Sequence, residues 1–94
     1  MFEWDEDKSR ANFEIRGFDF EFAARVFESE GLLKYEDRRR VYGERRHVVI
    51  GEVEGETLFV AYTWRGVNRR IISARRASRR ERDAHRQAFG KADR

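Results

Sequence analysis

Apolar and polar positions along this 94-residue chain repeat with two different periods, and each period predicts a different kind of element. Residues 5–17 and 19–31 repeat apolar or small side chains at helical spacing, and both stretches start with an aspartate and end at a glycine. Residues 32–76 instead alternate with a period of two, which is typical of strands. A helix start returns at Ser78, because Ser followed three residues later by Glu forms a capping box. A short alternation at residues 2–4 predicts one further strand ahead of the first helix.

Two short breaks divide the alternating region into strands. Breaks at residues 54–56 and 65–68 separate three strands, and residues 32–38 form a fourth. Turns this short join antiparallel neighbours. We therefore expect an α+β fold in which the N-terminal helices pack on a four-stranded antiparallel sheet, followed by a C-terminal helix. A chain of this length fits a single domain, residues 1–94.

The alternation also predicts which side chains share a face of the sheet. The face toward the two helices takes Leu58, Val60, Tyr62 and Trp64, and the opposite face takes Phe59, Ala61 and Thr63. On the next strand, strict alternation places Ile71 with Ser73 and Ile72 with Ala74. The face away from the helices then carries Thr63, Ser73 and the arginines at the strand ends.

The first helix has an unusual stripe. Lys8, Ala11, Asn12 and Ile15 share one side of it at helical spacing, and we interpret this side as facing inward. A polar inward stripe can line a functional site.

Charge is distributed unevenly along the chain. Residues 1–64 hold 10 Lys and Arg against 15 Asp and Glu, whereas residues 65–94 hold 11 against 3. This asymmetry favours a face that binds a polyanion such as nucleic acid, although a solvated helix face gives part of the same signal. Cysteine is absent, which excludes disulfides and thiolate chemistry. No apolar run approaches a membrane span and the first residues are acidic, so we expect a soluble cytoplasmic protein with no membrane contact.

Metal and nucleotide cofactors find little support in the sequence. His47 and His85 lie far apart and neither belongs to a cluster with ligand spacing. The glycines are scattered singly, without a loop that could cradle phosphates. We expect no metal and no cofactor.

The remaining chemistry rests on arginine, lysine, tyrosine and a few acids. This set suits RNA cleavage by the substrate's own 2′-hydroxyl, because the protein then needs only to align the strand, move protons and stabilise charge on the phosphorane. Guanidinium groups suit the last task, since their planar donors bind phosphate oxygens in pairs. Candidates for the proton transfers are Lys8, Asp37, Tyr62 and Glu81, each of which needs a tuned pKa.

Several of these residues also have a structural explanation. Arg75 and Arg76 flank a strand end, and at most one of them faces a given groove because adjacent residues point to opposite faces. Asp37 and Arg38 can form an exposed charge pair, and Tyr62 can be a core residue with its hydroxyl at the rim.

Six motifs occur in a specific order: "FEWDEDKSRANFEIRG" at residues 2–17, "FEFAARVF" at 20–27, "EDRR" at 36–39, "VYGERRHVVIG" at 41–51, "LFVAYTWRG" at 58–66 and "RRIISARRASRRER" at 69–82. The most specific of these pieces are "WDEDK" at 4–8 and "IISARRASRRER" at 71–82. In this order the sequence resembles the BrnT toxins of BrnT/BrnA type II toxin and antitoxin systems. The resemblance implies a RelE-like fold and a metal-independent ribonuclease that halts translation. It also implies neutralisation by a BrnA-type antitoxin, whose own domain binds promoter DNA, so that the toxin meets DNA only through its partner.

The resemblance also implies roles for single residues. Lys8 matches a lysine of the first helix, Asp37 and Arg38 match an acid and arginine pair on a strand, and further positions match along the sheet. The catalytic candidates are Lys8, Asp37, Arg45, Tyr62 and Arg75. The RNA-binding candidates are Arg38, Arg46, Thr63, Arg70, Arg76, Arg79 and Arg80. One departure is at residues 15–17, Ile-Arg-Gly, where the family commonly has Lys-His-Gly. Either the family's histidine is not essential or this chain is a weak nuclease, and we favour the first because the helix-terminal position suits a capping histidine.

Two other functions stay open at this point. The same arginines could serve a non-catalytic module that binds nucleic acid or an acidic protein. The chain could also act only as a structural or co-repressor subunit inside an antitoxin complex.

Overall fold

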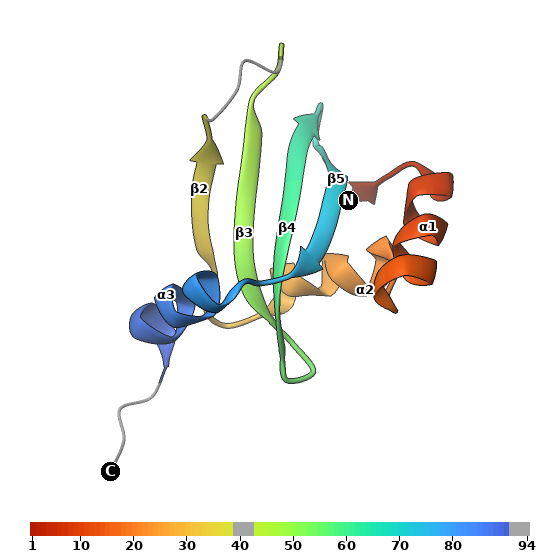
Figure 1. The fold of residues 1–94 in the computed structure, drawn as a ribbon. Coiled ribbons are helices and arrows are strands. Elements are labelled where there is room, and N and C mark those ends of the chain that lie inside the picture. Colours follow the sequence, from red (N-terminus) through yellow and green to blue (C-terminus); the bar gives the residue numbers. More distant parts are fainter. Residues whose placement is uncertain (39–42, 91–94) are drawn as a thin grey trace.

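The computed structural model describes residues 1–38 and 43–90 (Figure 1). Residues 39–42 and 91–94 lie outside the described part; residue 39 ends the "EDRR" motif, and residues 41 and 42 begin the "VYGERRHVVIG" motif. In chain order the elements are β1 (Phe2–Glu3), α1 (Glu6–Arg16), α2 (Phe20–Ala24), the 3-10 helix η1 (Arg25–Glu28), β2 (Leu33–Asp37), β3 (Arg46–Val53), β4 (Glu56–Arg65), β5 (Asn68–Arg76) and α3 (Arg79–Phe89). The predicted α+β class is confirmed.

The sheet has five strands rather than the expected four antiparallel ones. Its order is β1-β5-β4-β3-β2, and β1 pairs with β5 in parallel while the other neighbours are antiparallel. The backbone N–H of Arg69 also donates to the carbonyl of Met1 at 2.9 Å. The expectation was wrong because β1 and β5 are separated in the chain by all the other strands and two helices, so no short turn in the sequence indicates their pairing.

The two faces of the sheet carry separate apolar clusters. On one face, which we call the α2 face, Leu58 and Val60 pack against the side chains of α2 and η1. On the other face, the α3 face, Phe59 and Ala61 pack with Ala77, just ahead of α3. Figure 1 shows α2 and α3 on opposite sides of the strands. The predicted faces of β4 are therefore confirmed for its buried residues.

A bulge in β5 corrects the predicted alternation on that strand. The register shifts between Ala61 and Tyr62 of β4, so that Ser73 pairs with Ala61 whereas Ile71 pairs with Tyr62. Ile71 and Ala74 consequently share the core of the α2 face. The prediction that they lie on opposite faces was wrong because one extra residue in a strand inverts the parity beyond it.

The predicted inward stripe of α1 was also wrong. Lys8, Ala11 and Ile15 are exposed, Ile15 at 77 %, and the buried residue of the helix is Ser9. The Ser9 hydroxyl accepts the backbone N–H of Phe20 at 2.9 Å, so α1 docks on α2 through a polar contact that hydrophobic spacing does not reveal. The helix ends are as predicted, with Asp5 accepting two backbone N–H groups and Gly17 in the left-handed conformation.

The terminal helix attaches through its polar side chains, since none of its residues is fully buried. Ser78 and Glu81 form the predicted capping box. Arg82 donates to the carbonyl of Ala77 at 2.8 Å, and His85 Nε2 lies 3.1 Å from the carbonyl oxygen of Gly31. These contacts hold α3 across the ends of β2 and β3. Within the described ranges, no helix has the length and apolar character needed to cross a membrane.

We predict that Gly51→Ala destabilises the fold. Gly51 lies on the α2 face of β3, and an added Cβ would come within 2.7 Å of Leu32 Cδ2 and 2.8 Å of Val26 Cγ2. Overpacking of this kind costs about 1–3 kcal/mol. Urea unfolding of the variant measures the loss. The exposed neighbour Glu52→Ala is the control, and equal free energies of unfolding for the two variants would contradict the packing described for β3.

Candidate functional site

Many of the predicted site residues lie on the α3 face of the sheet. The strand pairing places Phe59 opposite Arg75 and Thr63 opposite Arg70, while Asp37 lies opposite Arg46 at the far edge. Side-chain alternation puts all of these on the side of Ala61 and Phe59. The predicted residues on this face are Asp37, Arg46, Thr63, Arg70 and Arg75.

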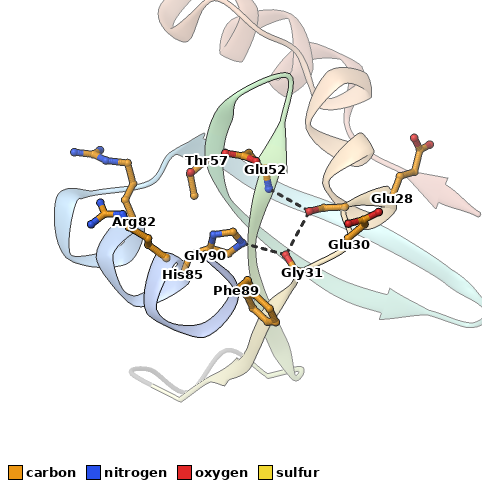
Figure 2. A pocket seen from close by; sticks show the side chains of 11 residues that line it. Glu28, Glu30, Gly31, Glu52, Thr57, Arg82, His85, Phe89 and Gly90 are labelled. Carbon is orange, nitrogen blue, oxygen red and sulfur yellow. Dashed lines mark hydrogen bonds between the residues drawn. The ribbon is translucent and has the colours of Figure 1, made fainter. Parts of the chain in front are cut away.

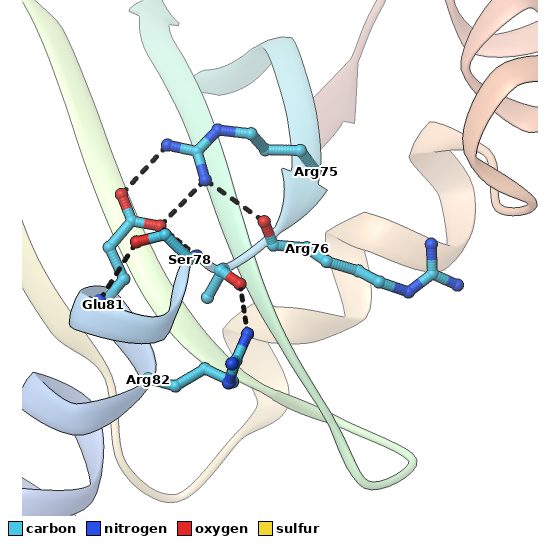
Figure 3. A network of polar contacts seen from close by, with 6 residues as sticks. Arg75, Arg76, Ser78, Glu81 and Arg82 are labelled. Carbon is cyan, nitrogen blue, oxygen red and sulfur yellow. Dashed lines mark hydrogen bonds and ion pairs between the residues drawn. The ribbon is translucent and has the colours of Figure 1, made fainter.

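Arg75 is held in a fixed position between β5 and α3 (Figure 3). Its Nη1 and Nη2 donate to the two carboxylate oxygens of Glu81 at 2.8 and 2.9 Å. Nη1 also donates to the carbonyl of Arg76 at 3.1 Å. The guanidinium carbon lies 3.9 Å from the centre of the Phe59 ring, so the plane of the group is supported by an aromatic side chain.

The fixed guanidinium of Arg75 still has donors to offer. Glu81 and the Arg76 carbonyl take three of its five N–H groups, which among the described residues leaves Nε–H and one Nη2–H. These two point the same way along one edge of the guanidinium plane. The side chain is 36 % exposed, so an oxyanion can reach this edge. Two parallel N–H groups match two oxygens of a phosphate.

Glu81 has a double role at this position. Its carboxylate binds Arg75 and also accepts the backbone N–H of Ser78 at 2.8 Å. The hydrogen bonds from Arg75 are the largest cause that lowers the pKa of Glu81 below its usual value. The group is therefore ionised at neutral pH and keeps the guanidinium aligned.

The opposite end of the α3 face has a second polar group. Arg70 donates to Glu3 at 3.0 Å, and this hydrogen bond lowers the pKa of the Glu3 carboxyl. Thr63 is buried, and its hydroxyl donates to the carbonyl of Arg45 at 2.6 Å. Asp37 is also buried at the end of β2.

Four other RNA-binding candidates lie off this face or at its margin. Arg76 points to the α2 face, where it lies over the Phe18 ring and pairs with Glu56, as expected from its position next to Arg75. Arg38 pairs with Glu36, so the expected pair with Asp37 is not the one observed. The remaining two are exposed in the first turn of α3 and have no side-chain partner among the described residues: Arg79 and Arg80.

The catalytic candidates do not gather around Arg75. Tyr62 is 5 % exposed in the core of the α2 face, on the reverse of the sheet. Lys8 is exposed on α1, which packs on α2 and lies apart from α3 in Figure 1. Asp37 is on β2, three strand spacings or about 14 Å from β5. Arg45 is exposed next to the end of β2, with Nε 3.9 Å from Glu36.

The contribution of Phe59 was missed in the sequence. Phe59 supports Arg75 because the two are cross-strand partners. Counting the register from the turn at residues 65–68 without the bulge would pair Phe59 with Ala74 instead. Only the bulge brings the ring under the guanidinium.

A groove of about 640 Å³ lies on the other side of α3 (Figure 2). One wall of the groove carries the acidic residues Glu28, Glu30 and Glu52. The other wall is formed by α3 and carries Arg82, His85 and Arg86. The groove thus carries both acidic and basic side chains, and none of the predicted site residues lines it. In the part of the chain that the structure describes, no three His, Cys, Asp or Glu side chains group as metal ligands would.

The α3 face thus carries an arginine, Arg75, whose guanidinium is held in place by Glu81 and Phe59. Residues 4–81 match the family model described as "Ribonuclease toxin, BrnT, of type II toxin-antitoxin system". The chain belongs to this family. The match confirms the resemblance seen in the motifs, and it extends to Glu81, so the pair of Arg75 with Glu81 lies inside the BrnT region. As a member of a type II system, a BrnT toxin has a protein antitoxin as its partner. A search of curated proteins gave no match.

We predict that Glu81→Gln removes a pH-dependent part of the stability. Because Arg75 lowers the pKa of Glu81 below 4.5 in the folded state, the stabilisation is complete above pH 4.5 and is lost as the pH falls through the lower folded value. For a partly exposed pair it amounts to about 1 kcal/mol at neutral pH. Urea unfolding at pH 7 and pH 3 measures it, and Asp83→Asn, which breaks an exposed pair with Arg86, is the control. If the free energies of unfolding of wild type and Glu81→Gln differ by the same amount at both pH values, the prediction is contradicted.

Proposed function

We propose that this chain is a single-domain endoribonuclease of RelE-like fold that cleaves RNA through attack of the substrate's 2′-hydroxyl, without a metal ion. The observation that supports this most directly is the free edge of Arg75, held in place by Glu81 and Phe59. A guanidinium fixed before the substrate arrives can stabilise the charge that develops on the phosphorane without reorganising.

In this proposal the RNA strand lies along the α3 face. Arg75 binds the scissile phosphate, and Glu81 positions Arg75 without touching the substrate. Arg70 and Arg46 lie toward the other end of the same face, where they bind flanking phosphates. Phe59 and Thr63, the partners of Arg75 and Arg70, are four residues apart on β4, a separation of about 13 Å along the strand. This spacing gives the substrate two fixed contacts and so restricts its path.

Arg79 and Arg80 add positive charge beside Arg75, at the start of α3. Their guanidinium groups lack carboxylate partners among the described residues, so they attract the polyanion at little cost. By cleaving RNA the toxin inhibits translation, and a BrnA-type antitoxin neutralises it. Promoter DNA is contacted only through the antitoxin.

A second candidate function is a non-catalytic module that acts inside a complex. The observation in its favour is that three of the four predicted proton-transfer residues, Lys8, Tyr62 and Asp37, lie on elements away from Arg75. The fourth, Glu81, is hydrogen-bonded to Arg75 itself. A module of this kind would bind RNA or an acidic protein through the same arginines and would have no turnover.

We predict that the purified protein degrades total RNA in the presence of EDTA and that Arg75→Ala slows turnover by about 10²–10³-fold. Binding should weaken much less, because the variant loses a contact that strengthens in the transition state. Arg10→Ala, which removes an exposed arginine on α1, is the control and should keep full activity. If the RNA stays intact with the wild-type protein as well as with Arg75→Ala, the result would favour the non-catalytic module.

We also predict that expression of the chain without an antitoxin arrests growth and lowers the incorporation of labelled amino acids. Arg75→Ala should relieve both effects, and co-expression of a BrnA-type antitoxin should do the same. Unaffected growth with soluble, folded wild-type protein would instead support a subunit that acts only within the complex.

A further inference from the structure

Arg69 is surrounded by aromatic rings on the α2 face of the sheet. Its guanidinium carbon lies 4.4 Å from the ring centre of Phe27, 4.7 Å from that of Trp64, 5.8 Å from that of Tyr62 and 6.0 Å from that of Phe2. The strand pairing explains the arrangement, because Phe2 and Trp64 are the neighbours of Arg69 on its two sides. The register therefore brings two of the four rings beside Arg69, and the ring of Phe27 comes from η1.

The row of rings continues across the sheet. His47 pairs with Tyr62, and the two rings lie 5.3 Å apart with a tilt of 31°. Tyr62 itself is buried, whereas Trp64 is 45 % exposed and His47 is half-buried. The accessible part of the row thus consists of Trp64, His47 and the Arg69 side chain between the rings.

Arg69 differs from the other arginines of its strand, because none of the described carboxylates pairs with it. Arg70, Arg75 and Arg76 pair with Glu3, Glu81 and Glu56. The side chain of Arg69 has no hydrogen bond or ion pair to any described residue, and its Nε is buried without a partner. Aromatic faces attract a cation, but they do not satisfy its N–H donors. Because solvent does not reach the Nε, an oxygen acceptor from outside the chain would bind the other donors of this half-buried side chain.

The surrounding rings indicate what kind of molecule supplies that acceptor. A nucleotide carries a phosphate for the guanidinium and a flat base for an indole or imidazole face. A carboxylate from an acidic peptide would satisfy Arg69 but would leave the exposed rings unused. The combination favours single-stranded RNA over a peptide.

We propose that Trp64, His47 and Arg69, together called the stacking platform, bind an RNA nucleotide that flanks the cleavage site. The inference rests on the proposed function, because it extends the substrate path from the α3 face. Trp64 and Arg69 directly neighbour Thr63 and Arg70 in the chain and lie on the opposite face of the sheet. An RNA strand that passes Arg70 reaches the platform by turning around the end of the sheet at the β4–β5 connection, beside the exposed Arg65.

The direct test uses the fluorescence of Trp64 in a Trp4→Phe background, where it is the only tryptophan. The ligand is a 2′-O-methyl oligoribonucleotide, which cannot be cleaved because it lacks the attacking hydroxyl. We expect saturable quenching. Absence of quenching, or quenching by poly-glutamate but not by the oligonucleotide, would overturn the inference, the second outcome in favour of an acidic protein ligand.

Variants provide an independent measurement by fluorescence anisotropy with the same oligonucleotide. Loss of one stacked base predicts that Trp64→Ala weakens binding roughly 5- to 150-fold. Arg69→Gln should weaken it and lower its salt dependence, since one phosphate contact is lost. Phe13→Ala and Arg10→Gln, an exposed aromatic and an exposed arginine on α1, are matched controls that should stay near wild type. Equal affinities for Trp64→Ala and Phe13→Ala would count against the platform.

Cleavage of unmodified RNA separates this inference from the proposed function. Arg75→Ala should lose cleavage and keep the quenching of Trp64, whereas Trp64→Ala should raise KM with little change in kcat. If Trp64→Ala cleaves RNA with an unaltered KM, the stacking platform is contradicted and the proposed nuclease mechanism is not. If the oligonucleotide quenches Trp64 but the wild-type protein does not cleave RNA, the nuclease mechanism is contradicted and the platform is supported as a binding site.

Discussion

The contact of Arg75 with Glu81 and Phe59 connects the sheet, the terminal helix and the candidate site. Glu81 belongs to the first turn of α3 and to its capping box, so the carboxylate that aligns the guanidinium also stabilises the start of the helix. None of the residues of α3 is fully buried, and polar contacts from Arg82 and His85 help to fix its place. The geometry of the site and the attachment of the helix therefore depend on the same ion pair, and a change that weakens one also weakens the other.

Local sequence signals predicted much of this fold. The caps at Asp5 and Ser78 and the alternation of β4 depend on neighbours a few residues away, and the structure has them where they were expected. The misses involve partners far along the chain. The parallel pairing of β1 with β5 spans more than sixty residues, and the docking of α1 depends on the Ser9 hydroxyl, which hydrophobic spacing leaves out of account.

The candidate site was predictable only in part for the same reason. Adjacent residues on a strand face opposite ways, and this rule alone separates Arg75 from Arg76. The proximity of residues on different elements depends on strand order, which the motifs do not encode. β3 and β4 lie between Asp37 and Arg75, and the sheet itself lies between Tyr62 and Arg75. Membership of the BrnT family establishes the class of protein, whereas the grouping of its residues follows from the sheet.

Next to the β4–β5 turn, neighbouring residues of the two strands lie on opposite faces of the sheet. Thr63 and Arg70 face the α3 side, while Trp64 and Arg69 face the α2 side. Arg70 is neutralised by Glu3, but Arg69 contacts only aromatic rings among the side chains that the structure describes. A polyanion therefore gains more at Arg69 than at Arg70, because it displaces no carboxylate there. If RNA reaches both faces, the unneutralised charge on the α2 side would hold the strand, and the preset edge of Arg75 on the α3 side would act on it.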